Sequence, residues 1–386
     1  MKIVIINNLY GKYARGGAER IVEIVVDELV RRKHQVLVIL AKPIKGVQPP
    51  IGGWTPTQDA FYPWNVISYY NLYKLPKFIH PLWHLINIFN LQSYFKIKKN
   101  LKSEKPDIVM THNLMGVGFL IPLAIRACNI KHIHTIHDIQ LLHPSGLMNV
   151  NEEKKIDSFF AKIYQVINKK LFFGVGVVIS PSEWLMNEHI KRGFFKKAQR
   201  VILPNPINTP SCLARKVNDG SNKFIFLYVG QIEKHKGIDV LLESFIKLEG
   251  NNVLWIVGDG KESQKSKVKS QKSKNDNIKF FGRKTSAEVQ ELMQKANCLI
   301  VPSLCYENQP TVIIEAVQNN LPIIASDIGG IPEMLNKKFL FKAGDIASLK
   351  NKMRFIVDNY DNIKNIPASS RINIFAQSYV DKILSL

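Results

Sequence analysis

Apolar runs of four to six residues recur through the second half of the chain. Each is followed by a loop rich in glycine or polar residues, and then by a pattern typical of a helix. Such runs are typical of buried parallel strands. The predicted strands span residues 224–229, 253–257, 278–281, 298–301 and 322–325. This alternation predicts a doubly wound parallel sheet, in which ligands gather at the carboxyl ends of the strands.

The first half of the chain has a similar rhythm. Its predicted strands span residues 2–6, 35–40, 107–111, 132–136, 175–179 and 200–203. A helix with Val22, Val25, Val26 and Leu29 at core spacing follows the first strand. Residues 204–222 are rich in proline, asparagine and serine, and we expect them to link two domains.

Size and composition fit a two-domain globular protein. The chain has 386 residues, 46% of them hydrophobic, which allows two full cores. The first apolar run is too short for a secretory signal, and no run approaches the ~20 residues of a membrane span. The four cysteines lack metal-type spacing, so we expect reduced thiols in a cytosolic protein.

Several common site motifs are missing from the sequence. No G-x-G-x-x-G follows the first strand and no Walker-type lysine motif occurs, which disfavours dehydrogenase and ATPase functions. No Asp-x-Asp stands in a loop, so we predict no metal site and no cofactor.

The formal net charge of +22 has more than one interpretation. A basic surface suits an anionic membrane leaflet, a nucleic acid or an acidic polymer. A general bias towards Lys, Ile and Asn explains it equally well. The densest lysine run, 261–274, contains no aromatic residue, which disfavours nucleic-acid binding. We expect that run to be a solvated, mobile excursion.

An aromatic-rich stretch spans residues 61–95. It could form an acceptor site, or a membrane-facing surface together with neighbouring lysines. Those lysines are Lys74, Lys77 and Lys96. Core packing is the simpler interpretation, because several apolar residues have helical spacing. They are Leu82, Leu85, Ile86 and Phe89.

Two glutamates, Glu307 and Glu315, flank the start of the helix predicted after strand 298–301. Glu307 lies in the strand-to-helix loop, Pro310 suits the first helical turn, and Glu315 lies about five residues further on. The helix is apolar on nearly every side, which predicts burial, and a buried carboxylate needs partners. Glu315 is therefore either a structural carboxylate or a ligand of ribose hydroxyls, with the nucleotide phosphates on the helix amides.

The stretch 302–333 resembles the retaining glycosyltransferases of family 4. Their pattern is a glutamate, seven residues, Glu-Ala, a small-residue segment and Gly-Gly, and Glu307, Glu315-Ala316 and Gly329-Gly330 match it. The resemblance implies an α/β protein of the GT-B fold, with two Rossmann-like parallel-sheet domains facing a cleft. Residues 1–204 would form the acceptor-side domain and 205–370 the nucleotide-sugar domain. A last helix within 371–386 would cross back to the first domain.

The family pattern implies a UDP- or GDP-sugar donor held by the second domain. Lys236 matches the lysine that contacts the diphosphate, whereas Gln231 stands where an arginine is expected. Glutamine cannot neutralise a phosphate, so Lys234 or Arg283 would have to compensate. The remaining donor-site candidates are Gly258, Asp259, Asn308, Gln309, Pro310 and Thr311.

Three further positions come from the first half of the chain. Gly16 and Gly17 allow close backbone approach to a phosphate, or simply form a helix-start turn. His137 coincides with the family's histidine that approaches the reacting sugar, although a single histidine is more often structural. Asn205 resembles a hinge segment of the family, and a turn explains it equally well.

Together these features predict a retaining transferase that moves a sugar to a glycan or lipid-linked acceptor. His137, Glu307 and Lys236 are the catalytic candidates. The setting would be bacterial-type polysaccharide or glycolipid assembly, in the cytoplasm or peripherally on the inner face of the membrane, with no nucleic-acid partner. Two alternatives stay open. One is a nucleotide-sugar epimerase of the same fold, and the other is a binding module that has lost catalysis.

Overall fold

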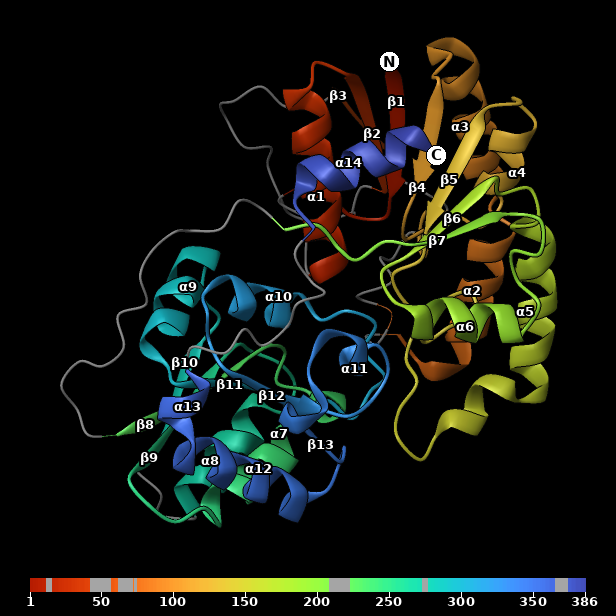
Figure 1. The fold of residues 1–386 in the computed structure, drawn as a ribbon. Helices are drawn as coiled ribbons and strands as arrows, with labels where there is room; N and C mark the ends of the chain where they lie inside the picture. Colours follow the sequence, from red (N-terminus) through yellow and green to blue (C-terminus); the bar gives the residue numbers. More distant parts are fainter. Residues whose placement is uncertain are drawn as a thin grey trace. The chain divides into compact units, whose positions relative to one another are not determined.

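The computed structural model describes residues 1–11, 16–41, 57–61, 72, 75–207, 223–272, 277–364 and 374–386. The chain forms two compact units (Figure 1). Unit 1 comprises Met1–Leu147, Lys154–Asn208 and Ile374–Leu386, and unit 2 comprises Met148–Glu153 and Thr209–Asn373. Each unit is built on a doubly wound parallel sheet, as predicted.

The sheet of unit 1 has seven strands in the order β3-β2-β1-β4-β5-β6-β7. They are β1 (Lys2–Asn7), β2 (Gln35–Ala41), β3 (Thr57–Phe61), β4 (Ile108–Thr111), β5 (Lys131–Thr135), β6 (Val177–Ser180) and β7 (Gln199–Ile202). Every strand except β3 was predicted from the sequence. The edge strand β3 reads TQDAF and has no apolar run, so the hydrophobic pattern does not reveal it.

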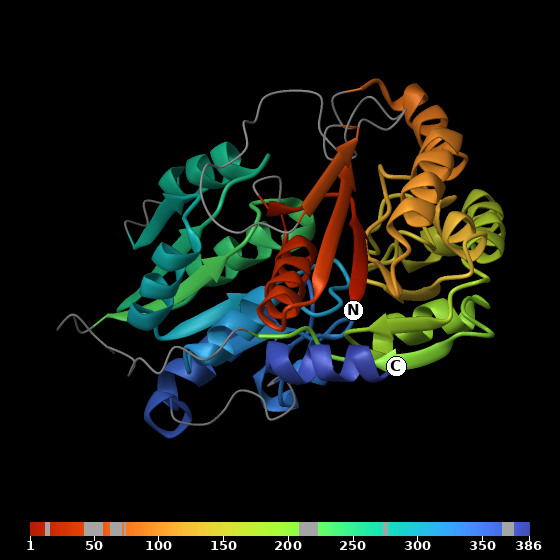
Figure 2. The ribbon, with the colours of Figure 1, turned by 90° about the horizontal axis from the view of Figure 1, so that it is seen from above.

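The helices of unit 1 are α1 (Gly17–Arg31), α2 (His80–Ile88), α3 (Leu91–Glu104), α4 (Ile121–Arg126), α5 (Phe159–Leu171), α6 (Glu183–Lys191) and α14 (Ala376–Ser385). The C-terminal helix α14 packs beside α1 on one face of the sheet (Figure 2). Its Tyr379, Val380 and Ile383 join the buried core that α1 and the strands form. No helix in the described parts of the chain is both long and apolar enough to span a bilayer.

The sheet of unit 2 has six strands in the order β10-β9-β8-β11-β12-β13. They are β8 (Phe224–Val229), β9 (Asn252–Val257), β10 (Ile278–Gly282), β11 (Cys298–Val301), β12 (Ile323–Ser326) and β13 (Leu340–Phe341). All were predicted except β13, whose two residues are too few to leave a pattern. Every strand pairing in the described parts of both units is parallel.

The helices of unit 2 are α7 (Ile238–Ile246), α8 (Ser263–Lys272), α9 (Ser286–Lys295), α10 (Thr311–Gln318), α11 (Ile331–Met334), α12 (Ile346–Asp358) and α13 (Tyr360–Ile363). Helices α7 and α12 pack together on one face of the sheet. A capping box forms at the start of α9. Glu288 N–H donates to Thr285 Oγ1, and Thr285 N–H donates to the Glu288 carboxylate.

Both sheets reverse their strand order at one point, between β1 and β4 in unit 1 and between β8 and β11 in unit 2. The loops that leave the carboxyl ends of two such strands diverge to opposite faces of the sheet. The crevice between them is where open parallel sheets bind their ligands. In unit 2 these loops are residues 230–237 and 302–310, which contain Lys236 and Glu307.

Two predictions about the organisation of the chain are wrong. Residues 148–153, which we assigned to the first domain, belong to unit 2. The lysine run 261–274 is not a mobile excursion, because its described part forms helix α8 beside α7. Ser266 on α8 is buried, and Lys265 pairs with Glu262 one turn earlier. Of the expected linker, residues 208–222 lie outside the described residues.

The core interpretation of the apolar stripe on α2 is also wrong. Leu82, Leu85 and Phe89 are 56%, 52% and 46% exposed. The buried residues of this helix are Trp83, Asn87 and Ile88, which lie on its other side. Most of the aromatic residues earlier in this stretch lie outside the described residues.

The packing of α14 leads to a test of its role in unit 1. Tyr379 is 1% exposed, so Tyr379→Ala removes a large buried side chain and leaves a cavity. We expect a loss of about 3–5 kcal/mol in the free energy of unfolding. Lys382→Ala, on the exposed side of the same helix, is the control and should change stability little. Equal melting temperatures for the two variants would contradict the packing of α14 on unit 1.

Candidate active site

The loops that follow β8 and β11 are joined by their backbones. The carbonyl oxygen of His235 accepts hydrogen bonds from the N–H groups of both Leu304 and Cys305, at 2.8 and 3.0 Å. Gly237, at the end of the first loop, has a φ of +75°, and a Cβ there would lie 1.8 Å from the Pro302 carbonyl oxygen. Only glycine fits at that position. These contacts fix the separation of Lys236, between His235 and Gly237, from Glu307, just after Cys305.

Lys236 and Glu307 form an ion pair at this point, with 2.6 Å between Nζ and Oε1. Ser303 Oγ also donates to Oε1 at 3.0 Å, and Cys305 Sγ lies 3.6 Å from it. All three contacts are made to the same carboxylate oxygen. Among the described residues, none of these groups donates to Oε2. The pair thus leaves one carboxylate oxygen able to accept from a ligand hydroxyl.

Both members of the pair stay charged at neutral pH. Removal of water raises the pKa of Glu307, but the attraction of Lys236 and the three donors outweigh it, so the net pKa is lowered. Desolvation lowers the pKa of Lys236, but the nearby Glu307 carboxylate outweighs that effect and raises the net pKa. The side chains are 27% and 17% exposed for Lys236 and Glu307, so the cation can still be reached from solvent.

The loop after β12 packs against the backbone of Glu307. Gly330 N–H donates to the Glu307 carbonyl oxygen at 2.8 Å. Gly329 has a φ of +62°, and a Cβ there would lie 2.2 Å from the same oxygen. The Gly-Gly pair of the sequence pattern therefore holds the main chain of the residue that pairs with Lys236.

Helix α10 begins directly after the loop 302–310 that follows β11, and Pro310 is its N-cap rather than part of its first turn. The proline at the N-cap offers no side-chain acceptor and the first turn has no acidic residue of its own, so the cap leaves the first N–H groups of the helix unsatisfied. The prediction that the helix is buried is confirmed in part, because none of its residues is exposed. Its buried residues are Ile313, Ile314 and Ala316, whereas Glu315 is half-buried.

The other donor-site candidates of unit 2 lie on the same edge of the sheet. Gln231 is exposed, and its carbonyl oxygen accepts from Tyr228 Oη at 2.6 Å. Asp259 accepts from Gly260 N–H and Ser263 Oγ, both at 2.8 Å, at the start of α8. These hydrogen bonds, and more weakly the nearby Arg283, lower the Asp259 pKa.

The remaining candidates differ in exposure. Lys234 and Arg283 are exposed cations, and Gln309 is buried. Gly258 has a φ of +136° and lies against the Gly230 carbonyl oxygen. Asn308, Pro310 and Thr311 are half-buried in the loop and at the helix start.

A segment from the first half of the chain braces the Glu307 loop. Val150 N–H donates to the Leu304 carbonyl oxygen at 2.9 Å, and Tyr306 N–H donates to that of Met148 at 2.8 Å. Tyr306 Oη donates to Glu153 at 3.0 Å. Sequence reasoning missed this brace because 148–153 contains no strand-like apolar run. Ser303 was also missed, although its place directly after a predicted strand was a usable signal.

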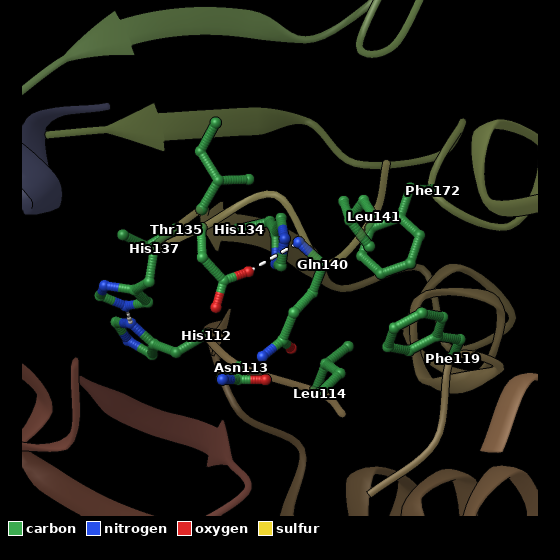
Figure 3. Close-up of a pocket in the computed structure, with 12 residues that line it drawn as sticks. His112, Asn113, Leu114, Phe119, His134, Thr135, His137, Gln140, Leu141 and Phe172 are labelled. Carbon is green, nitrogen blue, oxygen red and sulfur yellow. Dashed lines mark hydrogen bonds between the residues drawn. The ribbon is translucent and has the colours of Figure 1, made fainter. Parts of the chain in front are cut away.

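In unit 1, His137 lies at the carboxyl edge of the sheet, two residues beyond Thr135, where β5 ends. Its Nε2 lies 3.0 Å from Nδ1 of His112, which follows β4, and Figure 3 shows the two rings facing one another. Loss of hydration lowers the pKa of His137 to about 4, and that of His112 falls well below its usual value through burial and the neighbouring His137. Both rings are therefore neutral at pH 7. Sequence reasoning missed His112, although it directly follows a predicted strand.

The same edge of unit 1 holds a carboxyl group with an unusual pKa. Desolvation raises the pKa of Asp138 to about 7, the hydrogen bond from Gln140 N–H at 2.7 Å opposes this rise, and the nearby Glu19 adds to it. Glu19 is buried and accepts from Gly16 N–H at 2.8 Å. Gly16 is the N-cap of α1 and Gly17 its first residue. The Gly16 N–H therefore already donates to a carboxylate of the protein.

The hinge candidate Asn205 is buried in unit 1, two residues before Ile207, which pairs with Phe375 beside α14. No group of three or more metal-ligating side chains occurs among the described residues. Cys128, Cys298 and Cys305 are free thiols, and Cys212 lies outside the described residues. The expected lack of a metal and of a cofactor stays a prediction.

The close approach at Gly237 can be tested with a matched pair of variants. Gly237→Ala would place a methyl group against the Pro302 backbone and should displace the loop that carries Lys236. Gly282→Ala is the control, because Gly282 has a similar φ of +69° but nothing within 4 Å of its Cβ position. Both variants carry the backbone strain, so a larger fall in melting temperature for Gly237→Ala measures the clash. Equal falls would contradict it.

The raised pKa of Asp138 predicts a pH-dependent stability. The folded state binds a proton more tightly than the unfolded state, so this residue destabilises the protein increasingly as pH rises from about 4 towards 7. Asp138→Asn removes the titration and keeps an oxygen that accepts from Gln140 N–H. We expect its melting temperature relative to wild type to rise over that range and to level off above pH 7. A constant difference between pH 4 and 8 would refute the assignment.

Comparisons with known proteins agree with this arrangement. Residues 15–210 match the family model described as Glycosyltransferase Family 4, and residues 213–371 match the one described as Glycosyl transferases group 1. An uncharacterised 42.6 kDa protein in the cps region of Klebsiella pneumoniae is 26% identical over 90% of this chain and 92% of its own length.

A relative of named activity and a solved structure extend the comparison. The Escherichia coli UDP-Gal:alpha-D-GlcNAc-diphosphoundecaprenol alpha-1,3-galactosyltransferase is 25% identical over 78% of this chain and 79% of its own. The structure of Anabaena HepE in complex with UDP-glucose matches 100% of both chains, with a TM-score of 0.71 and 16% sequence identity. With a family model matching just over half of its residues, the chain belongs to glycosyltransferase family 4 and is a glycosyltransferase of the GT-B fold.

Proposed function

We propose that this protein transfers a sugar, with retention of anomeric configuration, from a nucleoside diphosphate sugar to a glycan or lipid-linked acceptor. The reaction would serve the assembly of a bacterial-type polysaccharide or glycolipid. The observation that carries the proposal is the ion pair of Lys236 and Glu307 at the point where the strand order of unit 2 reverses. It combines a reachable cation, a carboxylate oxygen open to hydroxyl groups and an adjacent uncapped helix start.

These groups match the parts of a nucleotide sugar in order. A diphosphate suits the Lys236 ammonium and the uncapped N-terminus of α10, because both favour negative charge. Sugar hydroxyls suit Oε2 of Glu307. Glu315, one turn further along α10 and half-buried, is placed to accept from the hydroxyls of a ribose.

The chemistry that this arrangement supports is departure of the diphosphate. As the bond between the anomeric carbon and the diphosphate oxygen breaks, negative charge grows on the leaving group, and Lys236 is fixed where it stabilises that charge. The acceptor oxygen then bonds to the anomeric carbon on the same face. In this proposal its proton passes to the departing phosphate oxygen, so no enzyme nucleophile is needed.

Because Gln231 stands where the family pattern has an arginine, the diphosphate site has one positive charge fewer than that pattern. The exposed Lys234 and Arg283 are further cations on this edge of unit 2, and Arg283 acts on the Asp259 carboxylate. Lys236 is held in place by its ion pair with Glu307. The proposal therefore gives Lys236 a larger share of transition-state stabilisation than a site with two fixed cations would need.

The relatives support the donor and acceptor classes. The E. coli relative is named for a UDP-galactose donor and a diphosphoundecaprenol-linked acceptor. The structure of HepE was solved with UDP-glucose. We extend the class to this chain, a nucleoside diphosphate sugar and a glycan or lipid-linked acceptor, but not the individual sugars. His137 stays a candidate for contact with the sugar through the family resemblance, and the tests of unit 2 do not depend on it.

Lys236→Ala should lower kcat by about 10²-fold, because it removes a fixed cation beside the developing charge. Lys247→Ala is the control, since Lys247 is an exposed lysine at the other end of α7. Radiolabelled UDP- and GDP-sugars would first identify the donor. Melting curves of both variants would then separate a lost charge from a lost fold.

The same assay discriminates the other functions. Isomerisation of the donor without transfer would indicate an epimerase, and binding without any turnover would indicate a binding module. A folded Lys236→Ala variant with near-normal turnover would show that this loop is not the diphosphate site.

A further inference from the structure

Two helices of unit 1 expose apolar side chains in regular stripes. On α2 and the turn before it, Phe78, Leu82, Leu85 and Phe89 follow one another at intervals of four, three and four residues, which places them on one side of a helix. Phe78 is 81% exposed and the other three are about half exposed. Helix α3 continues the pattern with two exposed apolar residues, Leu91 and Phe95.

Helix α5 carries a second stripe. Phe159, Ile163, Val166 and Phe173 share one side of this helix or its direct continuation, and Phe159 and Phe173 are 73% and 48% exposed. Phe160, beside the stripe, is 80% exposed. Apolar side chains grouped in this way on the surface of a soluble domain mark a place where another apolar body binds.

The two stripes belong to neighbouring parts of unit 1 (Figure 1). Phe119 joins them, because its N–H donates to the Asn87 carbonyl oxygen of α2 and its ring packs on Tyr164 of α5. Helix α3 reaches the same segment through Ser93, whose hydroxyl donates to the Val117 carbonyl oxygen.

The charge on these helices is almost entirely positive, and Glu104, the last residue of α3, is paired with Lys2 at 2.6 Å. Residues 78–103 contain no aspartate or glutamate, and neither do residues 158–173. Lys99 and Lys102 are exposed on α3, and Lys162 and Lys170 are exposed on α5. Asp157, two residues before the start of α5, is paired with Arg192 at 2.7 Å. An apolar side flanked by lysines without nearby carboxylates is typical of helices that lie in the interface of an anionic bilayer.

We propose that the exposed side of α2, α3 and α5 binds the surface of a membrane rich in anionic lipid, with the phenylalanine and leucine side chains inserted among the acyl chains. A second copy of this chain is the less suitable occupant, because a symmetric contact would place like charges opposite each other. The proposal concerns a binding surface of unit 1 and does not depend on the donor site of unit 2.

The test is sedimentation of the full-length protein with vesicles of phosphatidylcholine alone or mixed with phosphatidylglycerol. We expect binding to the mixed vesicles that weakens as salt increases. Two double variants test the apolar stripes. Phe159→Ser with Phe160→Ser changes α5, and Leu82→Ser with Leu85→Ser changes α2. Each should lower the partition coefficient for the mixed vesicles at least about tenfold. Phe355→Ser, which removes a 37% exposed phenylalanine of unit 2, is the apolar control and should bind like wild type.

Charge is tested in the same way. Lys162→Gln with Lys170→Gln should reduce binding to the mixed vesicles at least about tenfold, because each lysine contributes near an anionic surface. Lys337→Gln with Lys342→Gln, two exposed lysines of unit 2, is the control.

Two results would overturn the proposal. One is wild-type protein that binds no vesicle of either composition. The other is a wild-type dimer in light scattering that the serine variants convert to monomers, because the stripes would then form a contact between copies. Melting curves of every variant establish that it is folded, so that lost binding reports the surface itself.

Discussion

The arrangement of the donor edge depends on one constraint, the fixed approach of the loops after β8 and β11. The His235 carbonyl oxygen accepts from two amides of the second loop, and Gly237 allows the first loop to lie against Pro302. Because these links are made by the main chain, they do not depend on side-chain rotamers. They place a lysine and a glutamate at hydrogen-bonding distance where the strand order of the sheet reverses.

The ion pair itself is a mixed contribution to stability. A half-buried ion pair loses much of its hydration, which costs free energy. The attraction between the two charges offsets this cost only when the geometry is good and further donors contact the carboxylate. Ser303 and Cys305 supply those donors to one oxygen of Glu307, which leaves the other for a ligand. The site thus resembles a preorganised binding surface more than a stabilising bridge, since its charges are already oriented before a ligand arrives.

Much of the fold could be predicted because buried parallel strands leave long apolar runs. The runs 224–229 and 298–301 became β8 and β11 with unchanged bounds, and they carry the two loops of the donor edge. The failures have physical causes. Strand β3 is polar and β13 has two residues, so neither leaves a pattern.

For the candidate site, the sequence named Lys236 and Glu307 but not their direct pairing. It also missed Ser303, His112 and the brace formed by 148–153. These depend on which loops the sheet order brings together, and a single sequence does not specify that order. The apolar stripe on α2 is a second feature that the sequence alone does not place. Helical spacing identified Leu82, Leu85 and Phe89 as one face, but spacing alone does not say whether a face packs inward or outward.

The central claim is that the donor nucleotide lies on unit 2 between the loop after β8 and the start of α10. A crystal structure with the nucleoside diphosphate that raises the melting temperature most would test it directly. The account predicts diphosphate oxygens within hydrogen-bonding distance of Lys236 Nζ and the first amides of α10, with the ribose hydroxyls on the Glu315 carboxylate. A diphosphate bound elsewhere, with the Lys236–Glu307 pair untouched, would contradict it.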